Sequence, residues 1–262
     1  MSDVLTGLLS AIYGTSTAST ATTDPSMAIL ALRRAVTGET KGAAKEAESP
    51  AFKRQAEAFK KAIDKAPDIK SALRDPKILS VLMPAMGMPD VVSQPGLVQR
   101  ALLADPKDTK GLLSRLTDTR WKDVATALDL GNKGLDALKD PELQAKLLKA
   151  LASGNWRTSQ DDVATGVSDA LYFQDKAESA KDVYAILGDP VLRRVVTGAL
   201  GLPDELALQT IEAQGRVVTT RLKLAKLQDS KEVKRLAERY VMNRAMAANG
   251  GQATSPLLSL FV

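Results

Sequence analysis

A pattern of helix starts and stops occurs twice in this sequence, at an interval of 114 residues. The stretch SALRDPKILSVLMPAMGMPD at 71–90 aligns without a gap on AILGDPVLRRVVTGALGLPD at 185–204. An aspartate accepts hydrogen bonds from the free amides of a helix start, and proline fits the first helical position. Glycine suits the left-handed residue that ends a helix. The repeat therefore predicts two copies of one multi-helix unit.

The matching positions are punctuation of helices. They are Asp75-Pro76 with Asp189-Pro190, Gly87 with Gly201, Pro89-Asp90 with Pro203-Asp204, Phe59 with Phe173, and Asp68 with Asp182. Each copy is expected to hold a helix ending near Leu73 or Leu187, a second starting at Asp-Pro, and a third opening at Pro-Asp. A looser match pairs 116–118 with 227–229 after a shift of three residues. A packing solution duplicated for structural reasons is favoured over a site formed by the repeated residues.

Similar helix starts, written Asp-Pro or Ser-Pro, punctuate the whole chain. They lie at Asp24, Ser49, Asp75, Asp105, Asp140 and Asp189. Between them apolar residues recur every three or four positions, as in 51–63 and 141–151, which is the spacing of one helix face. Aromatic residues make up only 4%, and no alternating run of β-branched residues is long enough to indicate a sheet. The predicted fold class is all-α.

We expect two related multi-helix units joined by a helical connection, with flexible termini. The expected segments are 1–49, partly helical and partly mobile; 50–130, the first unit; 131–159, the helical connection; 160–246, the second unit; and 247–262, an uncharged mobile tail. Residues 4–23 and 245–262 carry no charge, so Leu5 to Tyr13 and Pro256 to Val262 are candidate segments for binding a partner. The composition of the start predicts no Sec signal peptide, and no stretch approaches the roughly 20 apolar residues of a membrane span.

The residue inventory restricts the possible chemistry. There is no cysteine and no histidine, which removes the usual ligands of zinc, copper and haem, thiol nucleophiles and the imidazole of catalytic triads. Carboxylate-held Mg²⁺ or Ca²⁺ and hydrolysis by two carboxylates remain open. The acidic pairs Asp161-Asp162 and Asp204-Glu205 stand at expected helix starts, where negative charge complements the helix dipole. Capping is therefore favoured, and we predict no enzymatic activity and no cofactor.

The two tryptophans could be stacking platforms for bases or sugars, but each also has a structural interpretation. Trp121 falls on an apolar helix face with Val124 and Leu128, which favours a place in the core. Trp156 precedes an expected helix and could pack on it as a hydrophobic staple. Neither lies in an interleaved basic and aromatic pattern typical of nucleic-acid binding.

Positive charge is concentrated in residues 214–246, which hold nine basic and three acidic residues. Such a stretch can bind an acidic protein surface, anionic lipid or nucleic acid. Its apolar positions also fit an ordinary amphipathic helix with a solvated face, and nucleic acid is the less favoured partner. The candidate partner-binding residues are Arg216, Arg221, Lys223, Lys226, Lys234, Arg235 and Arg239.

The order of motifs resembles a bacterial family, the domain of unknown function 1217. The motifs are an L-x-D-P helix start, A-x-G-[ML]-P-D and a later L-x-D-x-R, carried by 73–90 with 116–120 and by 187–204 with 227–229. The second copy lacks the arginine and tryptophan that follow Asp118. The resemblance implies more than one copy per chain and an association with flagellar gene clusters, chiefly in alphaproteobacteria, where some members are called flagellar basal-body proteins.

These observations lead to one expected function and two alternatives. We expect a non-enzymatic flagellum-associated structural or assembly protein, in the basal body or cytoplasm, whose partners are other flagellar or export components. The first alternative is a cytosolic regulatory or chaperone-like adaptor whose basic C-terminal helices bind an acidic protein or nucleic acid. The second is a hydrolase that uses carboxylates alone.

Overall fold

The computed structural model describes residues 21–249, and the candidate segments 5–13 and 256–262 lie outside them. Within this range the chain forms fourteen α-helices and five short 3-10 helices, and it contains no strand, so the all-α prediction is confirmed. The α-helices are α2 (Pro25–Ala47), α3 (Pro50–Lys65), α4 (Ile69–Ala72), α5 (Pro76–Ala85), α6 (Pro95–Leu102), α7 (Leu112–Arg115), α8 (Arg120–Leu128), α9 (Leu130–Lys139), α10 (Pro141–Ser159), α11 (Val167–Lys176), α12 (Val183–Gly188), α13 (Pro190–Ala199), α14 (Ile211–Arg221) and α15 (Ser230–Ala248). The 3-10 helices are η1 (Pro89–Val91), η2 (Gln160–Asp162), η3 (Ala177–Ser179), η4 (Asp204–Leu208) and η5 (Leu224–Gln228).

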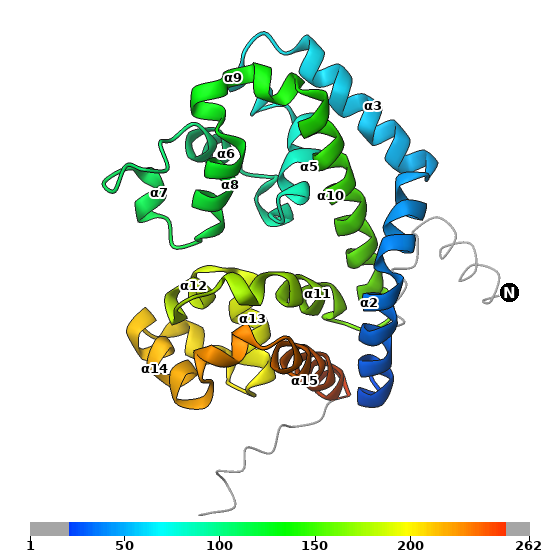
Figure 1. The fold of residues 1–262 in the computed structure, drawn as a ribbon, viewed down its shortest axis with the longest axis vertical. Coiled ribbons are helices and arrows are strands. Elements are labelled where there is room, and N and C mark those ends of the chain that lie inside the picture. The colour runs from blue at the N-terminus through cyan, green and yellow to red at the C-terminus, as the bar shows by residue number, and fades with distance from the viewer. Residues whose placement is uncertain (1–20, 250–262) are drawn as a thin grey trace, which may run out of the picture.

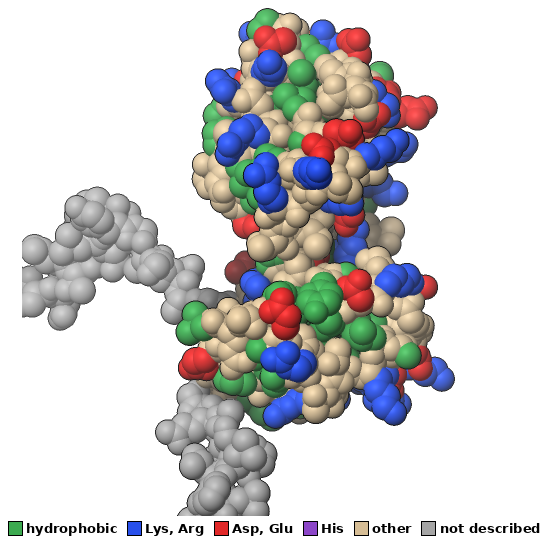
Figure 2. Space-filling view, turned by 90° about the vertical axis from the view of Figure 1, so that its left-hand side faces the viewer, with side chains coloured by type: hydrophobic (Ala, Val, Ile, Leu, Met, Phe, Trp, Pro, Cys, Tyr) green, Lys and Arg blue, Asp and Glu red, His purple; other side chains and the backbone are tan. Residues whose placement is uncertain are grey.

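The helices form two lobes with separate hydrophobic cores. The first lobe contains α3 to α9, and the second contains α11 to α15 (Figure 1). In the space-filling view the lobes are joined by a narrower waist (Figure 2). Phe59 and its counterpart Phe173 are both fully buried, one in each core, so the repeated positions fill equivalent places in the two cores.

Two long helices, α10 along the first lobe and α2 along the second, lie side by side where the lobes meet (Figure 1). Ala28, Leu32 and Ala35 of α2 are buried in the second core. Leu147 and Leu151 of α10 are buried in the first core. Because each helix contributes to one core and packs on the other helix, the pair holds the lobes together. The expected helical connection is thus part of a core.

The contact between α2 and α10 is close. A Cβ built at Gly42 would lie 1.9 Å from Nε1 of Trp156, whereas one at Gly38 would meet the same ring at 3.8 Å. Trp156 is inside α10, which continues to Ser159, so the prediction that it precedes a helix as a staple is wrong. Glu39 of α2 accepts a 2.6 Å hydrogen bond from Nε of Arg157 on α10.

Five of the six expected Asp-Pro or Ser-Pro helix starts are confirmed. In each, proline opens the helix and the preceding side chain accepts hydrogen bonds from backbone amides, at Asp24, Ser49, Asp75, Asp140 and Asp189. Asp105 is the exception, since it accepts from the amide of Lys107 in a turn and no helix starts at Pro106. The next apolar side chain after Ala104 is Leu112, so a helix started here would have had no apolar face to bury.

The repeat extends to hydrogen-bond geometry. Gly87 and Gly201 both have positive φ, 76° and 63°, and the following amides return to equivalent carbonyls at 2.9 Å, Met88 to Met83 and Leu202 to Thr197. These are the bonds of a helix stop with a left-handed residue. The expected third helix of each copy is only a 3-10 turn, η1 or η4. In the first copy the next α-helix, α6, begins at Pro95. Proline fits this first position because it lacks an amide hydrogen.

Trp121 is buried in the first core with 3% of its surface exposed, as predicted. Among the described helices, none is long and apolar enough to cross a bilayer.

Candidate functional site

The two lobes meet through residues of the repeated motifs. The amide of Thr119 in the first lobe donates a 3.0 Å hydrogen bond to the carbonyl of Gly188 in the second. A Cβ at Gly188 would lie 2.5 Å from Cγ2 of Thr119, so only glycine allows this approach. Similarly, a Cβ at Gly87 would lie 3.1 Å from Cε2 of Tyr172. The helix stop of the first copy therefore packs on the second copy.

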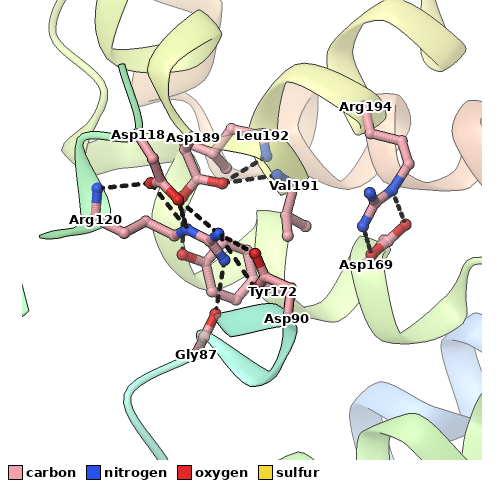
Figure 3. A network of polar contacts seen from close by, with 10 residues as sticks. All are labelled: Gly87, Asp90, Asp118, Arg120, Asp169, Tyr172, Asp189, Val191, Leu192 and Arg194. Carbon is pink, nitrogen blue, oxygen red and sulfur yellow. Dashed lines mark hydrogen bonds and ion pairs between the residues drawn. The ribbon is translucent and has the colours of Figure 1, made fainter. Parts of the chain in front are cut away.

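Arg120 is the central cation of this contact (Figure 3). Its side chain is 6% exposed. Nη1 donates to the carbonyl of Gly87 at 2.9 Å, and Nη2 donates to Asp118 at 2.7 Å and to Asp90 at 3.0 Å. Burial acts to lower the pKa of Arg120, but the hydrogen bonds and charges of Asp118 and Asp90 outweigh it, so the pKa is raised. The guanidinium thus stays charged and joins the helix stop to the start of α8.

A second pair, from the second lobe, faces this cation. The hydroxyl of Tyr172 donates to Oδ2 of Asp189 at 2.8 Å. Oδ1 of the buried Asp189 accepts from the amides of Val191 and Leu192 at 2.8 and 3.1 Å, which caps α13. Burial, with the charge and hydrogen bond of Asp189, raises the pKa of Tyr172. The hydroxyl therefore keeps its proton and serves as a donor.

A third group, within the second lobe, fixes the helices behind the contact. Arg194 of α13 donates from Nε and Nη2 to the two oxygens of Asp169 on α11, at 2.6 and 2.7 Å (Figure 3). Tyr240 of α15 donates to the same carboxylate at 2.7 Å. Burial, followed by the charge of Asp169, raises the pKa of Tyr240. A bidentate pair of this kind specifies orientation as well as adding energy.

The arrangement is suited to holding the two lobes in a fixed position relative to each other. Arginine is a donor only, the tyrosines retain their protons, and each carboxylate of the network accepts hydrogen bonds from neighbouring groups. No side-chain nitrogen or oxygen buried within residues 21–249 lacks a hydrogen-bond partner. The same range contains no group of three acidic side chains placed to hold a metal ion. The contact can hold two helical units in one register.

The structure leaves all seven predicted basic residues on the surface, in α14, η5, α15 and the link between α14 and η5. Lys226 and Arg235 both pair with Glu232, and the other five form no ion pair with any described residue. All seven are exposed, namely Arg216, Arg221, Lys223, Lys226, Lys234, Arg235 and Arg239. They do not take part in the network between the lobes.

The predicted acidic pairs behave differently from each other. Asp161 accepts from the amides of Gly166 and Ser168 at 3.1 and 2.9 Å, at the start of α11. Burial raises its pKa, against the hydrogen bonds of Ser168. Capping is therefore confirmed for Asp161. Asp204 and Glu205 lie exposed in the first turn of η4 without a capping hydrogen bond.

Reasoning from the sequence did not identify the contact partners Tyr172 and Gly188. A signal was present, because Gly188 stands where the first copy has Arg74, and Tyr172 where it has Ala58. The motif ending in Arg120 was singled out, but only as a feature of the resemblance.

The fold and the contact define a class: an all-α protein in which a duplicated helical unit docks on its own second copy. More particularly, the chain belongs to the family described as "Protein of unknown function (DUF1217)", whose sequence profile matches residues 85–233. The matched stretch contains the network from Gly87 to Arg194 and leaves out only Tyr240. The fold is similar to the crystal structure of protein AGR_C_984 from Agrobacterium tumefaciens, with a TM-score of 0.71 and 21% identity over 85% of this chain and 94% of that one. No curated protein matches the sequence.

Proposed function

We propose that this chain is a non-enzymatic, flagellum-associated structural or assembly protein that acts through helix-mediated protein contacts. The observation that carries a contact-based role is the network around Arg120, in which motif residues of one unit bind a second unit. A surface built from paired charges and a close glycine contact recognises another folded surface by shape and hydrogen bonding. The duplicated unit is thus a docking module in its own right.

The flagellar setting rests on the family. The resemblance of the motifs implies an association with flagellar gene clusters, and we propose a basal-body or cytoplasmic place on that ground. Flagellar or export proteins are the proposed partners. Absence of cysteine and uncharged ends are compatible with such a protein.

Gene deletion tests the setting. We expect a strain that lacks this gene to lose flagella or swimming, and a plasmid copy of the gene to restore both. Flagella counted by electron microscopy separate an assembly defect from a defect of rotation. Unchanged flagellation and swimming in the deletion strain would overturn the proposal.

A second candidate function is favoured by the exposure of the basic residues of α14 and α15. In this case the chain is an adaptor that binds an acidic protein or nucleic acid. Its binding to a fluorescent acidic peptide or a short DNA duplex would weaken steeply with salt. Reversing Arg216 and Arg239 to glutamate would abolish that binding, whereas Arg34→Glu on α2 would not. No binding of either probe at low salt would exclude this candidate.

A further inference from the structure

An open hollow of about 470 Å³ lies on the first lobe, and no residue of the network between the lobes lines it. Its lining contains three cations, Lys70 on α4, Arg74 just after α4 and Arg100 on α6. All three are exposed, and none forms an ion pair with an acid among residues 21–249. A concave surface lined by one sign of charge attracts the opposite charge.

A buried glutamine holds one of these cations in place. Gln99 is 9% exposed, and its Oε1 accepts a 3.1 Å hydrogen bond from Nε of Arg74. Its Nε2 donates to the carbonyl of Lys70 at 3.0 Å, so both ends of the amide are used and its orientation is defined. Nε of Arg100 likewise donates to a carbonyl, that of Gly96 at 3.3 Å. The terminal nitrogens of both arginines are bonded to no described residue, and such a planar pair of donors matches the two oxygens of a carboxylate.

The acids next to these cations are used as helix caps. Asp68, in the same hollow, accepts from the amide of Ser71 at 2.8 Å at the start of α4. Asp75 accepts from the amide of Lys77 at 2.7 Å at the start of α5. Helix-start amides of this kind commonly bind phosphate, but here the caps occupy them. An anion in this hollow is therefore held by the side chains of the cations, which favours carboxylates as the ligand.

A second hollow, of about 310 Å³, adjoins the first, because Asp75 lines it and the preceding Arg74 lines the other. No aromatic residue lines either hollow, and no large hydrophobic side chain of residues 50–139 is exposed. Separated cations without such side chains suit an extended acidic chain better than a membrane surface or stacked bases. The exposed cations of the second hollow, which pair with no acid among the described residues, are Arg54, Lys61, Lys65 and Lys77.

The second copy shows what kind of segment the equivalent place receives. Residues 68–76 and 182–190 share their local structure, since the aspartate that begins each range caps a helix at 2.8 Å and an Asp-Pro step starts the next helix. Gly188, the counterpart of Arg74, is covered by residues 117–119 of the other lobe. Arg74 is exposed instead. A polypeptide segment is thus the occupant that this part of the unit accommodates.

We propose that the two hollows of the first lobe bind an acidic segment of a partner protein, whose carboxylates pair with Arg74 and Arg100. The site is separate from the basic residues of α14 and α15. The inference rests on the proposed role in protein contacts and names the chemistry of one partner. Its failure would leave the flagellar role standing, which the deletion strain tests separately.

Fluorescence anisotropy of the full chain with a labelled peptide of alternating glutamate and glycine tests the proposal. We expect saturable binding at low salt that weakens as salt is added, because exposed charges are screened. Arg74→Glu and Arg100→Glu should each weaken binding by about tenfold or more. Arg115→Glu is a matched control that should change binding little. Arg115 is exposed on the same lobe, its Nε also donates to a carbonyl of its own chain segment, and it lines neither hollow.

Gln99→Glu separates positioning from charge, because it places a carboxylate beside Arg74 while every cation stays. It should also weaken binding by about tenfold, and far-UV circular dichroism shows whether each variant still folds. Unchanged binding in a folded Gln99→Glu chain would contradict the proposed place of the peptide beside Arg74.

No binding of the peptide at low salt would overturn the proposal, and so would an equal loss in Arg115→Glu. Loss of binding confined to Arg216→Glu and Arg239→Glu would assign the peptide to α14 and α15 instead. Inorganic phosphate that displaces the probe as well as unlabelled peptide does would indicate a site for a small anion. Tighter binding of a short DNA duplex than of the peptide would indicate a nucleic-acid site, and either result would exclude an acidic protein segment as the ligand.

Discussion

Replacing Arg120 by methionine tests whether the contact between the lobes depends on its central cation. Methionine keeps much of the length and apolar character of the side chain but removes every donor and the charge. The carbonyl of Gly87 then loses its 2.9 Å partner, and Asp118 and Asp90 lose their counter-ion.

The size of the effect follows from exposure. Breaking a buried ion pair by removing one partner costs about 3–5 kcal/mol. Asp118 is 18% exposed and still accepts from the backbone amide of residue 120 at 3.0 Å, and Asp90 is 55% exposed. Water therefore compensates part of the loss. We expect the free energy of unfolding to fall by about 2–3 kcal/mol.

Urea unfolding followed by far-UV circular dichroism measures this change. Lys231 provides a control, because it aligns with Arg120 in the looser sequence match, is exposed and pairs with no acid among the described residues. Lys231→Met should change stability by no more than about 0.5 kcal/mol. A loss in Arg120→Met as small as that of the control would show that the contact between the lobes does not depend on this cation.

Three further tests probe the scaffold around the contact. Glu39→Gln should cost about 2 kcal/mol at neutral pH; hydrogen bonds from its partners outweigh burial and lower the pKa of Glu39. The stability contributed by Glu39 is present above the ordinary pKa of 4.5 and is lost as the pH falls through the lowered pKa. The free energies of unfolding of the wild-type chain and of Glu39→Gln, measured in urea from pH 7 to 3, should therefore converge. A constant difference between the two chains would contradict this. Gly42→Ala should destabilise the protein by about 1–3 kcal/mol through its clash with Trp156. Gly38→Ala should stabilise it by up to about 1 kcal/mol. Equal thermal midpoints of the two variants would count against the close contact between Gly42 and Trp156. Gly188→Ala should lower the thermal midpoint of unfolding, and adding Thr119→Ser to that variant should partly restore it. No recovery in the double variant would argue against the clash between a Cβ at residue 188 and Thr119.

Local rules of helix punctuation predicted much of the fold. Asp75 and Gly87 were placed correctly because capping and left-handed glycine depend on the nearest few residues. The same rules failed at Asp105, because a helix start also needs an apolar face behind it. Trp156 was misplaced because nothing near it in the sequence reveals that α2 packs on its ring.

The contact between the lobes could be predicted only in part. Asp118 and Arg120 were visible as a motif, but their partners come from distant positions. Gly188 is required by the approach of another segment, which no local pattern encodes. A comparison of the two copies for positions that differ would have pointed to Gly188 and Tyr172. The expectation that repeated residues serve only as punctuation was too narrow, since Gly87 also accepts from Arg120.

Recovery of the protein with isolated flagellar basal bodies tests the proposed role most directly. A tagged chain expressed from its own locus would be quantified by mass spectrometry in purified basal bodies, in export fractions and in the cytosol. We expect enrichment with basal bodies or export components over an untagged strain and over abundant cytosolic proteins. A chain found in neither fraction above that background would contradict it.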